Sequence, residues 1–309
     1  MYVRDGQRLR TLALVLDLGS ISAAADVLGY TQSAVSQQLA ALEREIGVAL
    51  VDRSQRPLRA TPAGATLRPH VDRVLGALGA ADSVVEDLRG GVTRLRLAAF
   101  PSALASFVPA AVRDLRRTAR GVVVQVLQLE TQEAIERLRG GGADIAVVHH
   151  LPGVAVPEAS GLRWRRLIVD HLHVVLPDGH RLARGEEVSI GDLRDEPLIL
   201  PRRDTPAGRF RSVVEHLCAQ AGFTPRVAYE LDDLPAAQAF VAAGIGVVPM
   251  HGLTLTTVPP GATVRPLAER PAGSRTVEAV APRAAGSTIA DDLLERLQAA
   301  ARAYGQTRP

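Results

Sequence analysis

The side chains near the amino end that are best suited to chemistry are a short run of amides and hydroxyls: Gln32, Ser33, Ser36 and Gln37. Glutamine can form two hydrogen bonds to an adenine edge, and serine can donate to or accept from several bases. A helix that buries Val35 and Leu39 leaves these four residues on the outer side of its first half. This pattern favours a helix that reads base edges in the major groove, the alternative being an ordinary solvated helix surface.

Three arginines follow within a polar segment, at Arg53, Arg56 and Arg59. Arginine on a protruding hairpin can pair with phosphates or enter the minor groove of DNA. The alternative is a solvated charged surface. Residues 1–91 hold equal numbers of arginine and acidic residues, so we expect DNA binding to weaken only modestly with salt and to depend on dimerisation.

The histidines and the single cysteine do not form a metal or catalytic set. His149 and His150 are adjacent, so on a strand they point to opposite faces, whereas His171 and His173 share a face that more often lines a sheet than binds metal. Cys218 lies on the apolar stripe of a helix, where an inert core thiol is expected. Nucleophile-elbow, dinucleotide-binding and zinc-protease motifs are missing, and all 36 basic residues are arginine, which excludes a Schiff-base or P-loop lysine. We expect no metal, no cofactor and no enzymatic activity.

The composition indicates a folded, cytoplasmic protein with more than one domain. Its 309 residues are 47% apolar and 22% charged, with a formal net charge of +3. One cysteine excludes a disulfide-stapled secreted fold. No signal peptide is recognisable, and the two longest uncharged stretches, 97–112 and 234–264, are interrupted by proline and polar residues, so we expect no membrane association.

Three short helices are predicted to position the glutamines and serines. Apolar periodicity predicts helices over residues 9–16, 23–28 and 32–46. The residues expected to cap and close them are Ser20 or Ser22, Gly29, Thr31 and Gly47. Ala24 and Ala25 are small enough for two helices to cross closely, which favours a helix-turn-helix.

A hairpin and a long helix follow. Residues 48–51 and 58–60 have extended character on either side of a polar turn, which predicts a wing. Thr61-Pro62 begins a helix that ends near Gly90-Gly91. Apolar residues recur along it at spacings of four and three, as in a heptad seam: Leu67, Val71, Val74, Leu78, Ala81, Val85 and Leu88. We expect this seam to form a dimer coiled coil; the alternative is packing on the helix's own core, and Pro69 with two glycines argues against a stiff rod.

From residue 93 onward, strands and helices alternate. The first five elements are expected at 94–99, 101–117, 122–129, 131–139 and 143–148, a β-α-β-α-β order that implies parallel pairing. Further strands are predicted at 162–169, 171–176, 197–200, 226–229, 246–250, 263–266 and 277–281, and further helices at 206–221, 233–243 and 288–303. We expect two α/β lobes, lobe I from 92–163 plus 267–303 and lobe II from 164–266, with a ligand crevice between them.

Many positions of the amino-terminal region match one family in register: residues 19–25, 28, 32–39, 42–43, 46–47, 50–53 and 61–64. They strongly resemble the LysR-type transcriptional regulators, as does the stretch 240–249 more weakly. One departure is Val51, where the family usually has phenylalanine. The resemblance covers the whole chain and implies an all-α winged helix-turn-helix in 1–61, a linker and dimerisation helix in 62–91, and an α/β two-lobed effector domain in 92–309, similar to the periplasmic binding proteins.

The same resemblance implies a regulator that binds double-stranded promoter DNA, contacts RNA polymerase and assembles as a homodimer or homotetramer. It places a small-molecule effector between the lobes, at the positions Ser102, Ala103, Thr131, His149, His150, Arg202, Arg203 and Thr205. Helix starts near Ser102 and Thr131, together with the two arginines, indicate an anionic effector. The alternative is a ligand-independent DNA-binding regulator whose carboxy-terminal lobes serve only oligomerisation.

Overall fold

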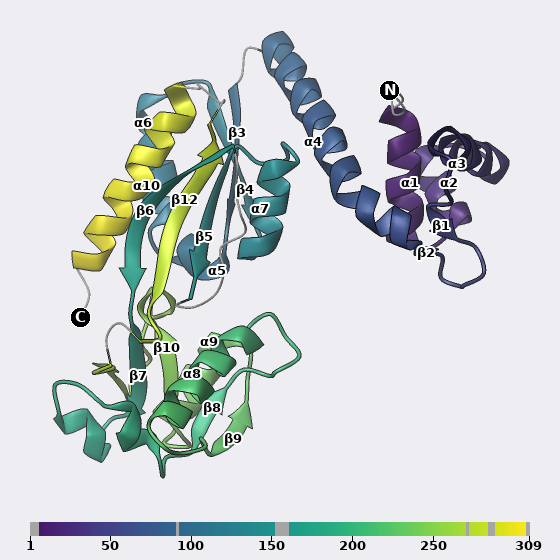
Figure 1. The fold of residues 1–309 in the computed structure, drawn as a ribbon. Coiled ribbons are helices and arrows are strands. Elements are labelled where there is room, and N and C mark those ends of the chain that lie inside the picture. The colour runs from purple at the N-terminus through teal and green to yellow at the C-terminus, as the bar shows by residue number, and fades with distance from the viewer. Residues whose placement is uncertain (1–5, 91–92, 152–160, 270–271, 284–287, 307–309) are drawn as a thin grey trace. The chain divides into compact units, whose positions relative to one another are not determined.

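The computed structural model describes residues 6–90, 93–151, 161–269, 272–283 and 288–306 (Figure 1). It divides into two compact units. The first comprises residues 1–94 with the short segment 136–143, and the second comprises 95–135 with 144–309. Each unit has its own apolar core, so each is described by itself.

The first unit is helical, with a small hairpin before its last helix (Figure 1). Its elements are α1 (Gly6–Leu18), α2 (Ile21–Leu28), α3 (Gln32–Ile46), β1 (Val51–Asp52), β2 (Arg59–Ala60) and α4 (Pro62–Gly90). The strands pair antiparallel and are shorter than expected: the first begins at Val51 rather than at residue 48. The order of three helices, hairpin and long helix confirms the predicted winged helix-turn-helix.

The helix ends of this unit are set by the predicted residues. The Ser20 side chain accepts a hydrogen bond from the Ala23 backbone N–H, which selects Ser20 over Ser22 as the cap of α2. Thr31 caps α3 in the same way, through the Ala34 N–H. Gly29 closes α2 with a φ of 69°, a left-handed conformation that glycine adopts without strain.

An apolar cluster among the described residues holds α1, α2, α3, the hairpin and α4 together. Ala24 and Ala25 of α2 are fully buried where the three helices meet, as their small size predicted. Val51 is also buried in this cluster, so the valine found where the family usually has phenylalanine is a core-packing residue.

Lobe I of the second unit is built on a five-stranded sheet with the strand order β4-β3-β5-β12-β6. The strands are β3 (Thr93–Ala99), β4 (Val122–Gln128), β5 (Ile145–His150), β6 (Leu162–Asp170) and β12 (Arg275–Pro282). β3 and β5 run parallel, and β12 runs antiparallel to both of its neighbours. The helices of the lobe are α5 (Pro101–Ala105), α6 (Val108–Thr118), α10 (Thr288–Gln306) and α7 (Thr131–Arg139), of which residues 136–139 are grouped with the first unit.

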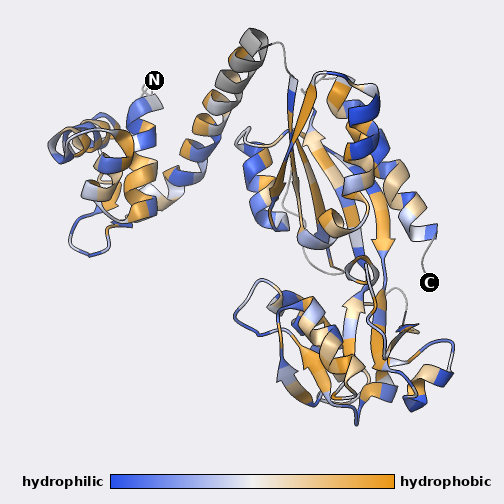
Figure 2. Cartoon of the chain, turned by 180° about the vertical axis from the view of Figure 1, so that it is seen from behind, coloured by the Kyte–Doolittle hydropathy of each residue, from blue (hydrophilic) through white to orange (hydrophobic). Residues whose placement is uncertain are grey.

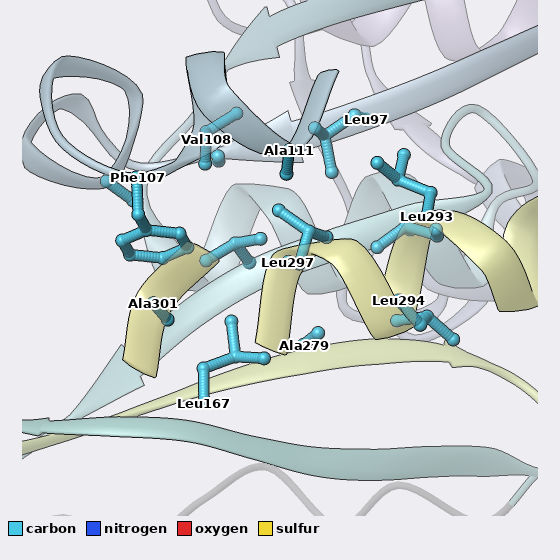
Figure 3. Packing of buried hydrophobic residues seen from close by; sticks show 14 of the residues in the cluster. Leu97, Phe107, Val108, Ala111, Leu167, Ala279, Leu293, Leu294, Leu297 and Ala301 are labelled. Atoms are coloured by element: carbon cyan, nitrogen blue, oxygen red, sulfur yellow. The ribbon is translucent and has the colours of Figure 1, made fainter. Parts of the chain in front are cut away.

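The core of lobe I lies between the sheet and the pair α6 and α10, which pack against each other (Figure 3). Leu293 and Leu297 of α10 are fully buried there against Ala111 of α6 and Leu97 of β3. Figure 2 shows the same pattern along the chain, because apolar residues run along the strands and polar residues lie on the outer helix faces.

Lobe II contains a three-stranded antiparallel sheet and a parallel strand pair. Its strands are β7 (Leu172–Pro177), β8 (Leu198–Leu200), β9 (Val227–Glu230), β10 (Val248–His251) and β11 (Ala262–Pro266). Its helices are α8 (Gly208–Gln220) and α9 (Leu234–Ala242), with the 3-10 turns η1 (Arg181–Arg184), η2 (Ile190–Leu193) and η3 (Gly252–Thr254). Cys218 of α8 is fully buried, and that burial raises the pKa of its thiol to about 11, as expected of an inert core cysteine.

Two expectations about the second unit were wrong. The helix predicted over 101–117 is split into α5 and α6, because Pro109 has no N–H and its ring would clash with the carbonyl of residue 105 in a continuous helix. The strand predicted at 162–169 is β6, which pairs with β12 in the lobe I sheet rather than belonging to lobe II. The chain therefore leaves lobe I at Asp170 and re-enters its sheet at Arg275.

Candidate nucleic-acid interface and effector site

The polar face of α3 lies where the sequence placed it. Gln32, Ser33 and Gln37 are exposed and Ser36 is half-buried. The opposite face is fully packed, with Val35, Leu39 and Leu42 in the core of the unit. The amino-terminal half of α3 therefore presents amides and hydroxyls from a rigidly held helix.

Hydrogen bonds hold this face to α2 and α1. The Gln32 Nε2 donates to the Ser22 Oγ at 2.8 Å, which fixes an otherwise flexible side chain. Gln38, which the sequence did not single out, turns inward, and its Oε1 accepts from the hydroxyl of the fully buried Thr11 at 2.6 Å. The two neighbouring glutamines at 37 and 38 thus serve opposite sides of the helix.

The hairpin is tied to α3 by Glu43. One carboxylate oxygen of Glu43 accepts from the backbone N–H groups of Leu50 and Val51, at 2.8 and 3.1 Å. The other accepts from the Arg53 guanidinium at 2.9 Å. Sequence reasoning missed this anchor, although an acidic residue of α3 followed by an arginine in the wing was the available signal.

The other two wing arginines are placed differently from Arg53. Arg56 and Arg59 are both exposed, and neither has an ion-pair partner among the residues that the structure describes. Their guanidinium groups are therefore available to phosphates, whereas that of Arg53 is partly committed to Glu43.

The predicted seam of α4 serves two different surfaces. Val71 is buried in the core of the first unit, and Leu67 packs against the same cluster. The prediction that Leu67 and Val71 belong to the dimer seam is corrected here, because both residues pack on the core of their own unit. Val74, Leu78 and Val85 are 45%, 48% and 45% exposed, and Leu88 lies outside the described side chains.

In lobe I, the predicted effector positions gather around a residue that the sequence did not single out, Arg275. Its Nη2 donates to the Ser102 Oγ at 2.7 Å, and its Nε donates to Asp170 at 2.8 Å. Its guanidinium carbon lies 4.9 Å from the centroid of the Phe100 ring, and that ring meets His149 edge-on at 4.7 Å. Arg275 is the first residue of β12, far along the chain from Ser102, Phe100 and His149. No local motif therefore indicated its role.

His149 is the most perturbed titratable group of this cluster. Burial, together with the positive charges of Arg275, His150 and Arg209, lowers the pKa of His149 to about 3. The neutral imidazole has its Nδ1 without a hydrogen-bond partner within the described parts of the chain. Its Nε2 lies 4.0 Å from the Glu130 carboxylate, whose own pKa is raised by burial.

Thr131 holds the backbone of His149 in place through two hydrogen bonds. Its hydroxyl accepts from the backbone N–H of His149 and donates to the carbonyl of the same residue, at 3.1 and 3.0 Å. The start of α7 is thereby fastened to the end of β5, which fixes the backbone that carries His149.

Two predicted positions of lobe I do not join the cluster with their side chains. Ala103 is fully buried in the lobe I core. His150 is paired with Glu278 of the neighbouring strand at 3.6 Å, because adjacent residues on a strand face opposite sides. No group of histidine, cysteine and acidic residues within the described ranges is arranged to hold a metal ion.

The predicted residues of lobe II form pairs within their own lobe. Arg202 and Thr205 both bond to Asp232, and Arg203 bonds to Glu215 at 2.6 Å. The lobe II charge that acts on Glu130 and His149 is instead that of Arg209, an exposed residue of α8. The structure thus does not bring Arg202 and Arg203 to the lobe I cluster, and it adds Arg209 in their place.

The two units together define a class: a winged helix-turn-helix that binds DNA, joined to a two-lobed α/β domain of the kind that binds small ligands. Family models agree with this division. Residues 7–65 match the bacterial regulatory helix-turn-helix protein of the lysR family, and residues 89–302 match the LysR substrate-binding domain. The chain belongs to the LysR family of DNA-binding transcriptional regulators.

Named relatives and solved structures support this membership. The chain is 32% identical over 244 residues to the transcriptional regulator ShiR of Corynebacterium glutamicum, covering 77% of this chain and 80% of ShiR. It is 30% identical over 256 residues to the dual regulator GltC of Bacillus subtilis, covering 81% and 82%. The fold is similar to that of the LysR-family regulator CbnR, with a TM-score of 0.67 at 20% identity over 96% of this chain and 99% of CbnR.

Within the described residues, no helix is both long and apolar enough to span a bilayer.

Proposed function

We propose that this regulator reads a promoter through the exposed amino-terminal half of α3, with Gln32, Ser33, Ser36 and Gln37 at base edges. The observation that carries the proposal is the contrast between the two faces of α3: the inner face is fully buried, so only the polar face is free to enter a major groove. CbnR, whose fold is similar, has been crystallised with its target DNA. Because the ligand is chromosomal DNA, we place the protein in the cytoplasm.

Arg56 and Arg59 on the wing supply phosphate or minor-groove contacts, with Arg53 held partly by Glu43. Two copies joined along the exposed part of α4 present two α3 helices to a roughly palindromic site. Pairs of such dimers form the tetramer that is typical of the family.

The second unit, in this proposal, binds a small anionic effector beside His149. Arg209 and Arg275 direct positive charge at this position, and the neutral His149 ring offers a buried nitrogen without a partner in the described structure. Effector binding changes the relative pose of the two lobes and thereby of the paired subunits, which alters the bend of the bound DNA and contact with RNA polymerase. A ligand does this only through different affinities for the two poses.

Selection of bound duplexes from a random pool tests the DNA-binding part. The purified protein should enrich one roughly palindromic sequence, and a labelled duplex of that sequence should be bound in preference to scrambled competitor at low ionic strength. Enrichment of no sequence, with a panel of small carboxylates present, would contradict the proposal. The alternative, lobes that serve only oligomerisation, predicts that no compound in the panel raises the melting temperature.

A further inference from the structure

A cavity of about 440 Å³ lies where the chain passes between the lobes, lined among others by Ile168, Leu253, Leu255, Val258, Val264 and Tyr304. None of these residues belongs to the cluster around His149. We propose that this cavity, the hinge pocket, is a second ligand site, which takes an uncharged and largely apolar molecule of one or two rings.

Both lobes contribute walls to the hinge pocket. Leu253 belongs to the apolar core of lobe I, and Ile168 and Tyr304 pack against that core. Leu255 belongs to a separate core cluster in lobe II, and Val264 packs against it. A molecule in the pocket therefore contacts both cores at once, so its affinity depends on how the lobes are posed.

The charge of the lining decides which molecules fit. Two histidines line the pocket, and their Nδ1 atoms bond to the Ser274 hydroxyl (His171) and to the His171 carbonyl (His173). Among the described lining residues, Asp170 is the only one with a permanent charge, and its carboxylate is already occupied. Oδ2 accepts from Arg275, and Oδ1 accepts from the backbone N–H of Leu253 at 3.0 Å. An ionic ligand would lose hydration without gaining a counter-charge, whereas an apolar ring gains the burial of its surface.

The size of the pocket sets the scale of the ligand. Ligand pockets in proteins commonly measure about 300–1,000 Å³, and a dry cavity of roughly 150 Å³ already accepts benzene. The hinge pocket therefore has room for one or two fused or linked rings. Val258 and Thr257 are both exposed and line the pocket, so they mark its opening.

The hinge pocket is connected to the proposed effector position through one buried side chain. Asp170 lines the pocket and accepts from Arg275, which in turn donates to Ser102. A molecule that shifts Asp170 or the Leu253 backbone thus acts on the residue around which the lobe I cluster is arranged.

The test uses the full-length protein and two fluorescent probes with the same rings. 1-Naphthylamine is uncharged at neutral pH and has two fused rings, and 5-aminonaphthalene-1-sulfonate differs from it by a sulfonate. We expect saturable binding of the uncharged probe at one site per chain, at least tenfold tighter than binding of the sulfonate. Equal affinities, or no saturable binding, would overturn the proposal.

Variants locate the probe in the pocket. Val258→Trp and Thr257→Trp place a ring at the opening and should each weaken binding at least tenfold. Val126→Trp, at a comparably exposed valine of β4, should leave binding within twofold. Far-ultraviolet circular dichroism confirms that each variant is folded. Binding that is unchanged in both pocket variants, or lost in all three variants, would refute the assignment. Arg209→Ala, which weakens the proposed anion site, should leave probe binding intact, so the two proposals can fail separately.

Discussion

Asp170 and Arg275 lie directly opposite each other on the neighbouring strands β6 and β12, and their side chains form a buried ion pair at 2.8 Å. Asp170 is the last residue of β6, and Arg275 is the first of β12. The same pair therefore fastens both points at which the chain passes between lobe I and lobe II. The Arg275 guanidinium also donates to Ser102 and lies over the Phe100 ring. The same ion pair therefore connects the passage between the lobes with the proposed effector position.

Asp170→Asn should destabilise the protein by about 3–5 kcal/mol, because it leaves the Arg275 charge buried without its counter-charge. The measurement is the free energy of unfolding in urea at neutral pH. Asp114→Asn is the matched control: it removes the partner of Arg113 in an ion pair whose side chains are 65% and 43% exposed, and should cost less than about 1 kcal/mol. Similar losses in both variants would show that the buried pair has no special role.

Gln32→Ala should weaken binding to the selected DNA site by about 1–3 kcal/mol, the usual contribution of a bidentate base contact. Binding to random duplex should change little, since phosphate contacts dominate there. Fluorescence anisotropy with both duplexes measures the two affinities, and Gln220→Ala on lobe II controls for loss of an exposed glutamine. An equal loss on random DNA would contradict a base-reading role.

Val74→Arg should shift the protein toward smaller assemblies, because it places a charge in the exposed part of the α4 seam. Sedimentation velocity without DNA measures the distribution. Val48→Arg makes the same change at a valine that is 47% exposed, against 45% for Val74, and should leave the assembly unchanged. Leu67 and Val71 are unsuitable for this test, since changing them disrupts the unit's own core. An unaltered distribution in Val74→Arg would place the subunit contact elsewhere.

Arg209→Ala should reduce the thermal stabilisation that a carboxylate effector gives, by lowering the affinity at least severalfold. Arg203→Ala removes the same charge from the same region, but its guanidinium is bonded to Glu215, so the stabilisation should persist. Melting temperatures over a concentration series of each hit in a carboxylate panel give the apparent affinities. If Arg203→Ala has the larger effect, the lobe II anion contact is the one the sequence first indicated.

The low pKa of His149 makes stability depend on pH. Its pKa is about 3 in the folded protein, below the ordinary 6.5, so the unfolded chain takes up the proton first. The stabilisation is complete above pH 6.5 and is lost as the pH falls toward 3. At pH 5 the loss amounts to about 2 kcal/mol.

His149→Gln should lessen the fall in stability between pH 7 and pH 5 by about that amount, whereas His216→Gln, at an exposed site, should not. Urea unfolding at pH 7 and pH 5 measures the fall in stability for each protein. An equal fall in wild type and His149→Gln would refute the role of His149.

The amino-terminal unit was largely predictable because its signals are local. Ser20, Thr31 and Gly29 act on backbone groups within a few residues, so their types alone mark where helices begin and end. The inward and outward faces of α3 follow from the helical repeat. Pro109 is an equally local signal, and the continuous helix predicted over residues 101–117 overlooks the break that this proline causes.

Local sequence patterns were enough to predict the polar face of α3, the alternation of strands and helices, and the inert environment of Cys218. The folded structure was needed to show that Arg275 meets Asp170 and Ser102, that β6 belongs to lobe I, and that Val71 is core while Val74 is exposed. The difference lies in how far apart in the chain the interacting residues are. Periodicity and capping are set by neighbours along the chain, whereas ion pairs and strand order join residues a hundred or more positions apart, and no spacing rule connects them.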